Sequence, residues 1–156
     1  KGLGAAALLG DVVKGLVPVL LISRISLWDL AALACGVAAI VGHLASVFLR
    51  FKGGKGVATS LGVFLALCPI PTGIAAVTFA LMLGLTRMVS AGSIVAAISM
   101  TVAVFLLPHS VATAPANLLP SGPALKVIVA FVAVLVIVKH RSNIQRILRG
   151  SESKLF

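Results

Sequence analysis

The stretch VATSLGVFLALCPIPTGIAAVTFALMLGLT, Val57–Thr86, decides how the whole chain is read. It contains no charged residue, and it is too long for one straight span, because a membrane helix needs about 20 apolar residues. The motif Cys68-Pro69-Ile70-Pro71 interrupts it, and proline removes a helix hydrogen bond and bends the chain. We therefore predict a hairpin of two short helices, Val57–Leu67 and Thr72–Leu85, rather than one long kinked helix.

The rest of the chain has the same apolar character. The sequence is 60% hydrophobic and only 10% charged, whereas soluble domains carry about 25% charged residues. The predicted fold is one all-α integral membrane domain covering residues 1–156, a bundle of about six transmembrane helices. Because the chain begins at Lys1 without Met, we expect this domain to be incomplete at its N-terminus. The other predicted helices are Ala5–Ile22, Leu30–Leu49, Ile94–Leu107 and Ala124–Val138.

The basic residues predict how the bundle is oriented. The net charge is +10, but no aromatic residues interleave the Lys and Arg side chains as in a nucleic-acid-binding patch. With the hairpin, one membrane face receives most of the positive charge, which assigns it to the cytoplasm. A single kinked helix would move Arg87 away from that face. The basic face receives Lys1, the Arg50–Lys55 loop, Arg87 and the Lys139–Phe156 tail, and the other face receives Arg24 and Lys126.

The strongest chemical signal is Gly42-His43 followed by FKGGKGVAT, Phe51–Thr59. Glycine lets a backbone approach a ligand closely, and the unpaired N–H groups at a helix start attract anions, phosphate above all. Lys52 and Lys55 add positive charge. The motif is not a Walker A loop, because Gly56 follows Lys55 where that loop has Ser or Thr. The plainer interpretation is a flexible turn with ordinary lysines at the membrane edge.

Two other clusters fall on the same predicted face. Asp11 and Lys14 are spaced to pair on one helix face, either inside the bundle or at the membrane interface. The segment Thr86–Ser93 places Arg87, Ser90 and Ser93 around Gly92. These groups are suited to binding a phosphate or a hydroxyl. Alternatively, Ser93 merely caps a helix that starts at Ile94.

The tail after Lys139 predicts an interfacial helix, because Ile144, Ile147 and Leu148 recur at helical spacing. Arg146 and Arg149 are expected to anchor it at the membrane surface, whereas Asn143 lies at the helix start, near the other loops. His109 is interpreted as a loop histidine. Cys35 and Cys68 are far apart inside apolar segments, so neither a disulfide nor a metal site is expected.

In these residues the sequence resembles the bacterial acyl-phosphate:glycerol-3-phosphate acyltransferases, the PlsY family. The resemblance covers the chain from end to end, and the FKGGKGVAT block is its most specific part. Two departures stand out. The family's Ser-Gly-Asn loop and first membrane helix are absent upstream, and Ala45-Ser46 replaces the usual Phe-Pro. The matching blocks are Asp11–Gly15, Gly42-His43, Phe51–Thr59, Ser90–Ser93 and His140–Ile144.

The resemblance implies transfer of a fatty acyl group from acyl phosphate to the sn-1 hydroxyl of glycerol 3-phosphate, giving lysophosphatidic acid and phosphate. It implies a multi-pass protein of the bacterial inner membrane with a cytoplasmic-facing site, needing no metal and no cofactor. The expected partners are the two substrates and membrane lipid, with no nucleic acid, and the working expectation is a monomer. Candidate catalytic residues are His43, Lys55 and Ser93, and candidate substrate- or phosphate-binding residues are Lys14, Lys52, Gly53, Gly54, Gly56, Thr59, Arg87, Ser90 and Asn143.

Two questions of mechanism and function stay open in the sequence. His43 is the only plausible protein base for the attacking hydroxyl, because its pKa is naturally near neutrality. A substrate phosphate oxygen is the rival base and is favoured here, with a second pKa near 6. The competing functions are a small transporter or channel for an anionic solute, and a structural membrane subunit.

Overall fold

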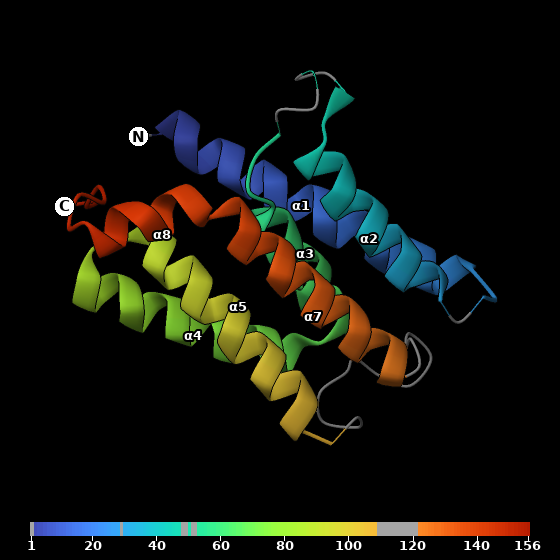
Figure 1. The fold of residues 1–156 in the computed structure, drawn as a ribbon. Coiled ribbons are helices and arrows are strands. Elements are labelled where there is room, and N and C mark those ends of the chain that lie inside the picture. Colours follow the sequence, from blue (N-terminus) through green and yellow to red (C-terminus); the bar gives the residue numbers. More distant parts are fainter. Residues whose placement is uncertain (1, 29, 48–49, 51–52, 109–121) are drawn as a thin grey trace.

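The computed structural model describes residues 2–28, 30–47, 50, 53–108 and 122–156. Lys52 and His109 lie outside these described residues. Seven helices occur within the described part of the chain (Figure 1). They are α1 (Gly2–Ile25), α2 (Ala31–Leu44), α3 (Val57–Leu67), α4 (Pro69–Thr86), α5 (Val89–Leu106), α7 (Gly122–Lys139) and α8 (Arg141–Leu148).

The helices have the lengths and composition of a membrane bundle. Four of them, α1, α4, α5 and α7, are long and apolar enough to cross a bilayer, and α2 and α3 are shorter apolar helices. Many large apolar side chains on their outer faces are exposed, as lipid-facing surfaces require. This confirms the predicted all-α integral membrane fold. Of the two helices predicted to be short, α3 is short, whereas α4 has 18 residues and is long enough to cross a bilayer. The short helix α8 follows α7 after His140, as the tail pattern predicted.

The predicted hairpin is confirmed. Helix α3 has the predicted bounds, and only Cys68 separates it from α4. Helix α4 begins at Pro69 rather than at the predicted Thr72. Proline is tolerated in the first turn of a helix, where its missing N–H would have had no helical partner. The two prolines therefore start the second helix instead of lying in a loop before it.

Two predicted boundaries were wrong by five residues each. Helix α2 ends at Leu44, before the predicted Leu49, because Ala45 leaves the helical conformation at φ −122° and ψ 48°. Helix α5 begins at Val89, five residues before the predicted Ile94. Arg87 ends α4 in the left-handed conformation at φ 62°, and Met88 is extended. The chain thus reverses within two residues, so Ser90 and Ser93 belong to the start of α5.

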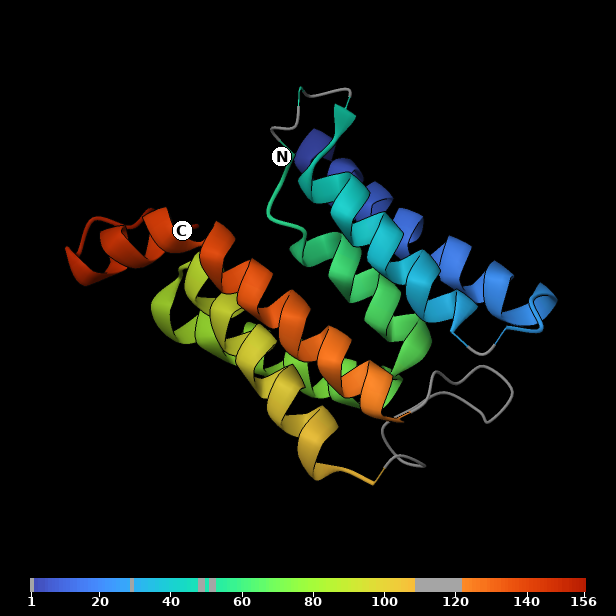
Figure 2. The ribbon, with the colours of Figure 1, turned by 45° about the vertical axis from the view of Figure 1, so that its right-hand side comes forward.

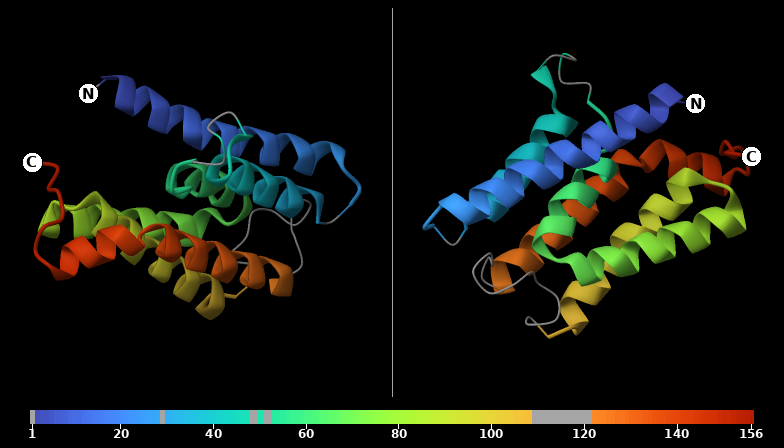
Figure 3. Two further views of the ribbon diagram at one scale, coloured as in Figure 1. Left: turned by 45° about the horizontal axis from the view of Figure 1, so that its top comes forward. Right: turned by 180° about the vertical axis from the view of Figure 1, so that it is seen from behind.

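The helices form two groups with α3 between them (Figures 2 and 3). Helices α1 and α2 pack on one side of α3, and α4, α5 and α7 lie on the other. Helices α1 and α3 cross closely, and glycine at the crossing makes this possible. A Cβ on Gly15 would overlap the Thr59 carbonyl, and a Cβ on Gly62 would overlap the Val12 carbonyl. Small residues at such crossings let membrane helices approach each other.

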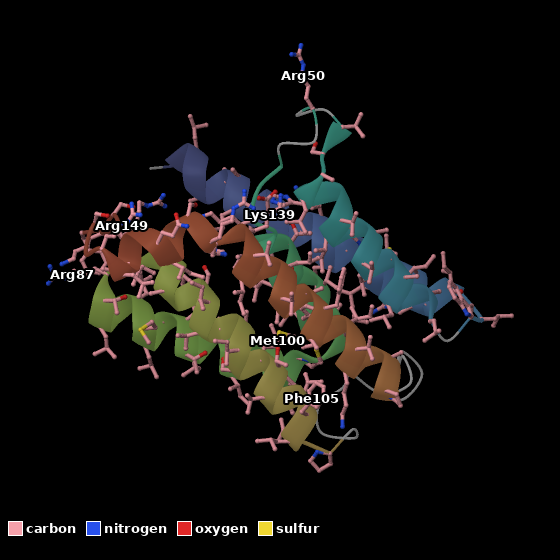
Figure 4. The ribbon with its side chains drawn as sticks, in the orientation of Figure 1. Arg50, Arg87, Met100, Phe105, Lys139 and Arg149 are labelled. Atoms are coloured by element: carbon pink, nitrogen blue, oxygen red, sulfur yellow. The ribbon has the colours of Figure 1, made fainter. Side chains whose placement is uncertain are left out.

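Both ends of the described chain lie at the same end of the bundle (Figure 3). Both ends lie together when the chain crosses the bundle an even number of times, and the α3–α4 hairpin makes the number of crossings even. Arg87, Lys139 and Arg149 lie toward that end, whereas Phe105 lies toward the opposite end (Figure 4). The basic loops and the α8 segment are therefore gathered at one end of the molecule.

Candidate functional site

A cavity of about 680 Å³ lies between α3, α4, α5 and α7, and the loop before α3 and the C-terminal segment also line it. Its lining is divided into two parts. Apolar side chains from the four helices make up most of the wall. Asp11 reaches the cavity from the middle of α1. The other polar and charged groups come from loop residues and from residues near helix ends, namely His43, Lys55, Ser60, Ser90, Ser93, His140, Asn143, Glu152, Ser153 and Lys154.

The glycine-rich loop is pressed against the end of α2. A Cβ on Gly53 would overlap the His43 carbonyl, and a Cβ on Gly54 would overlap His43 Nε2. Gly56 adopts φ 79°, a conformation that glycine enters without strain, and it packs against the Leu44 side chain. A side chain at Gly53 or Gly54 would therefore clash with the end of α2, and the backbone conformation at Gly56 favours glycine.

His43 is held between the glycine-rich loop and α1. Its Nδ1 lies 3.5 Å from Asp11 Oδ1, and the same carboxylate oxygen contacts Lys14 Nζ at 2.5 Å. The predicted pairing of Asp11 with Lys14 is confirmed. Asp11 and His43 line the cavity, whereas Lys14 does not. Asp11 therefore connects α1 to the imidazole that faces the cavity.

The start of α3 carries the features of an anion site. Gly56 precedes the first helical residue, and the Ser60 N–H donates to the Gly56 carbonyl at 2.8 Å. Lys55, Gly54 and Gly56 line the cavity at this point. Ser60 also lines it, and its hydroxyl oxygen is buried with no partner among the described residues. A helix N-terminus beside a lysine and an unsatisfied hydroxyl favours a bound anion.

The interpretation of Ser93 as the cap of a helix starting at Ile94 was wrong. Ser93 lies inside α5 and donates its hydroxyl hydrogen to the Val89 carbonyl at 2.9 Å. Ser90 lies one turn earlier and donates to Glu152 Oε1 at 2.5 Å. Both serines are buried and both line the cavity. The structure therefore brings them to the cavity wall, with their hydroxyl hydrogens already directed to protein acceptors.

Glu152 is the main polar residue that the sequence analysis missed. Its side chain is 3% exposed and accepts from Ser90, from Asn143 Nδ2 at 2.6 Å and from Arg146 Nε at 2.7 Å. These hydrogen bonds lower the pKa of Glu152 to about 2, and the bond from Ser90 has the largest effect. The expectation that Arg146 only anchors the tail at the membrane surface was incomplete, because Arg146 pairs with this carboxylate. Asn143 Oδ1 is left buried without a partner among the described residues.

His140 is a second missed residue. It is 2% exposed, lines the cavity, and lies at the junction of α7 and α8. Its Nδ1 lies 2.8 Å from the Val136 carbonyl, which can only accept, so Nδ1 carries the proton and Nε2 keeps its lone pair. Burial, with the nearby charge of Lys55, lowers the pKa of His140 below its usual value. The imidazole is therefore neutral near pH 7.

Arg87 does not line the cavity. Its carbonyl accepts from the Leu155 N–H at 2.8 Å, and its guanidinium lies 5.5 Å from the centre of the Phe156 ring. Arg87 therefore holds the C-terminal segment against the α4–α5 turn. Gly53 and Thr59 also lie off the cavity; Thr59 is fully buried at the α1 contact.

Comparison with protein families gives one match across almost the whole chain. The family model described as glycerol-3-phosphate acyltransferase matches residues 1–150. Curated relatives named glycerol-3-phosphate acyltransferase include proteins of Trichlorobacter lovleyi and Geobacter sulfurreducens. Each is 44% identical to this chain over 154 residues, which is 99% of this chain and 73% of the relative.

Two solved structures have the same fold. One is a crystal structure of PlsY (YgiH), described as an integral membrane glycerol 3-phosphate acyltransferase, in its glycerol 3-phosphate form. It superposes with a TM-score of 0.84 and 30% sequence identity, covering 100% of this chain and 72% of that one. The lysophosphatidic acid form of PlsY gives a TM-score of 0.83 at 30% identity, with coverage of 100% and 74%.

Proposed function

Because the chain belongs to the glycerol-3-phosphate acyltransferase family, we propose that it transfers a fatty acyl group from acyl phosphate to the sn-1 hydroxyl of glycerol 3-phosphate. One observation carries this proposal. One cavity joins an end lined by Lys55, Ser60 and the start of α3 to a largely apolar remainder. Both proposed substrates carry phosphate, and one of them also carries a long hydrocarbon chain.

The polar end offers groups for two phosphates. We assign Lys55 and the Gly54 and Gly56 amides to one of them, since a helix start and a lysine attract phosphate together. The second phosphate or the glycerol hydroxyls would lie nearer His140 and Asn143. Ser90 and Ser93 contribute there as hydrogen-bond acceptors, because their own hydrogens go to Glu152 and Val89.

The proposed reaction is one displacement at the acyl carbonyl. The glycerol hydroxyl oxygen forms a bond to the carbonyl carbon, and the bond from that carbon to the phosphate oxygen breaks. The hydroxyl proton goes to a phosphate oxygen, and the products are lysophosphatidic acid and inorganic phosphate. The Lys55 ammonium and the start of α3 would stabilise the oxyanion that forms during attack.

His43 is the alternative acceptor of that proton. Its contacts support a positioning role better, because one ring nitrogen faces Asp11 and the other meets Gly54. We therefore retain the substrate phosphate as the proposed base. The family match over residues 1–150 favours acyl transfer over a transporter or a structural membrane subunit.

The donor is tested directly with purified protein in detergent. Acyl phosphate and acyl-coenzyme A of the same chain length are supplied separately with glycerol 3-phosphate, and the products are measured by mass spectrometry. We expect lysophosphatidic acid and an equal amount of inorganic phosphate from acyl phosphate alone. Product formed only from acyl-coenzyme A would reject the proposed donor. Acylation at the secondary sn-2 hydroxyl, identified by proton NMR of the isolated lysophosphatidic acid, would reject the proposed position.

A further inference from the structure

The apolar part of the cavity is a long arm that runs down the bundle from the polar end. Along α5, the cavity is lined by Ser90 and Ser93, then Ala96 and Ala97, and finally Met100. At a rise of 1.5 Å per residue, Ser90 and Met100 are about 15 Å apart along the helix axis. Met100 lies part of the way along α5, between the end near Arg87 and Phe105 (Figure 4).

Helix α7 lines the same arm from the other side. Its residues run from His140 at the polar end to Val129 at the apolar end, which corresponds to about 16 Å of helix. Helix α4 repeats the pattern, from Phe79 to Thr72. The Thr72 hydroxyl donates to the Cys68 carbonyl at 2.8 Å, so its hydrogen is already used within the helix turn.

Side-chain size varies along the arm. Its middle is lined by alanines, Ala75 and Ala76 from α4 and Ala96 and Ala97 from α5, which leave room between the helices. Phe64, Met100 and Val129 line the far end, and each of them is at most 8% exposed. Phe79 on α4, with Val132 and Val136 on α7, lines the wall nearer the polar end. The buried side chains of Phe64, Met100 and Val129 therefore form the floor of the arm.

The cavity extends over about 15 Å of α5 from Ser90 to Met100, and its apolar lining, Ala96 to Met100, covers about 6 Å of that length. Because Met100 is the last residue of α5 that lines the cavity, we infer that the arm holds the end of the hydrocarbon chain of the acyl donor, and that Met100 at its floor sets the longest chain that reacts. The inference rests on the proposed acyl transfer, and it adds a residue that determines chain-length specificity.

The inference is tested with a ladder of straight-chain acyl phosphates, each two carbons longer than the last, and kcat/KM is measured for each donor. Met100→Ala should move the longest accepted donor to a longer chain and raise kcat/KM for that donor about tenfold, since one methylene in an apolar pocket is worth at least that much. Met100→Phe should lower kcat/KM for the longest donors and leave the shortest unchanged.

A matched control separates the floor from general core packing. Val104 lies one turn further along α5, is 2% exposed and does not line the cavity. Val104→Ala should therefore leave the chain-length profile unchanged. If a Met100 variant does not fold, Ala97→Leu provides an independent test, because it narrows the middle of the arm and should reject long donors in the same assay.

The failure of this inference differs from failure of the proposed function. A wild-type protein that uses no acyl phosphate of any length contradicts the proposed function before any variant is made. If the wild type transfers acyl groups and Met100→Ala, Met100→Phe and Ala97→Leu all keep its chain-length profile, the floor of the arm does not determine chain-length specificity.

Discussion

Lys55 is the residue on which the proposed chemistry depends most. It follows Gly54, whose backbone meets the His43 imidazole, and it directly precedes the glycine that starts α3. Lys55 and His140 both line the cavity, and the charge of Lys55 adds to burial in lowering the pKa of His140. Lys55 therefore lies at the polar end, where negative charge would gather during transfer.

Replacing Lys55 by alanine is expected to lower kcat/KM for acyl transfer by about 100-fold or more, the usual loss when one group that stabilises a developing oxyanion is removed. The measurement is phosphate release from acyl phosphate. Lys126→Ala is the matched control, because Lys126 lies over the Phe105 ring at the far end of the bundle and should retain activity. Normal activity in Lys55→Ala would remove the glycine-rich loop from the site.

Glu152 predicts how stability depends on acid. Its pKa is about 2 in the folded protein, below the ordinary 4.5, chiefly because Ser90 donates to it. Between these values the unfolded chain binds more protons, so stability falls as the pH drops from about 4.5 towards about 2. Above pH 4.5 this contribution is fully present and constant. The midpoint of thermal unfolding in detergent, measured across this pH range, checks the sign.

Glu152→Gln should lose that acid dependence. It should also unfold at a lower temperature at pH 7, since a hydrogen bond to a charged group contributes about 1.5–3 kcal/mol. Ser151→Ala is the control, because Ser151 is exposed and makes only a weak bond at 3.4 Å. If the melting temperature of Glu152→Gln still falls as the pH drops below about 4.5, other carboxylates cause the loss of stability.

The contact between α1 and α3 depends on glycine at specific positions. Gly62→Ala places a methyl group against the Val12 carbonyl, and the two backbones must separate, which we expect to cost about 1–3 kcal/mol. Gly84→Ala is the matched control, because Gly84 is also inside a helix and has open space around it. That change should be neutral or stabilising by about 0.5–1 kcal/mol. Thermal unfolding of both variants in detergent measures the difference, and equal melting temperatures would contradict the tight crossing.

The whole bundle has a distinct polar end, which we propose faces the cytoplasm because positive loops stay inside. The test uses a chain whose own cysteines, Cys35 and Cys68, are replaced by alanine. Arg149→Cys should react with a membrane-impermeant maleimide only in inside-out vesicles. Lys126→Cys should react only in right-side-out vesicles. The reverse labelling pattern would place the site on the outer face.

The helices were largely predictable because their signals act over a few residues. The uncharged run in Val57–Thr86 and its prolines predicted the α3–α4 hairpin, and the spacing of Asp11 and Lys14 predicted their ion pair. Apolar composition alone indicated the membrane. The start of α5 was missed because Arg87 adopts a left-handed conformation there, and no pattern in the preceding residues indicates such a conformation in an arginine.

The polar end of the cavity depends on contacts between distant parts of the chain. Ser90 and Glu152 are 62 residues apart and meet only because the C-terminal segment folds back onto the α4–α5 turn. His140 reaches the cavity only because α7 packs beside α5. Composition and local spacing are enough to choose membrane helices, since apolar burial and proline geometry are local effects. Which polar groups face one another follows from how those helices pack, and packing is decided by the molecule as a whole.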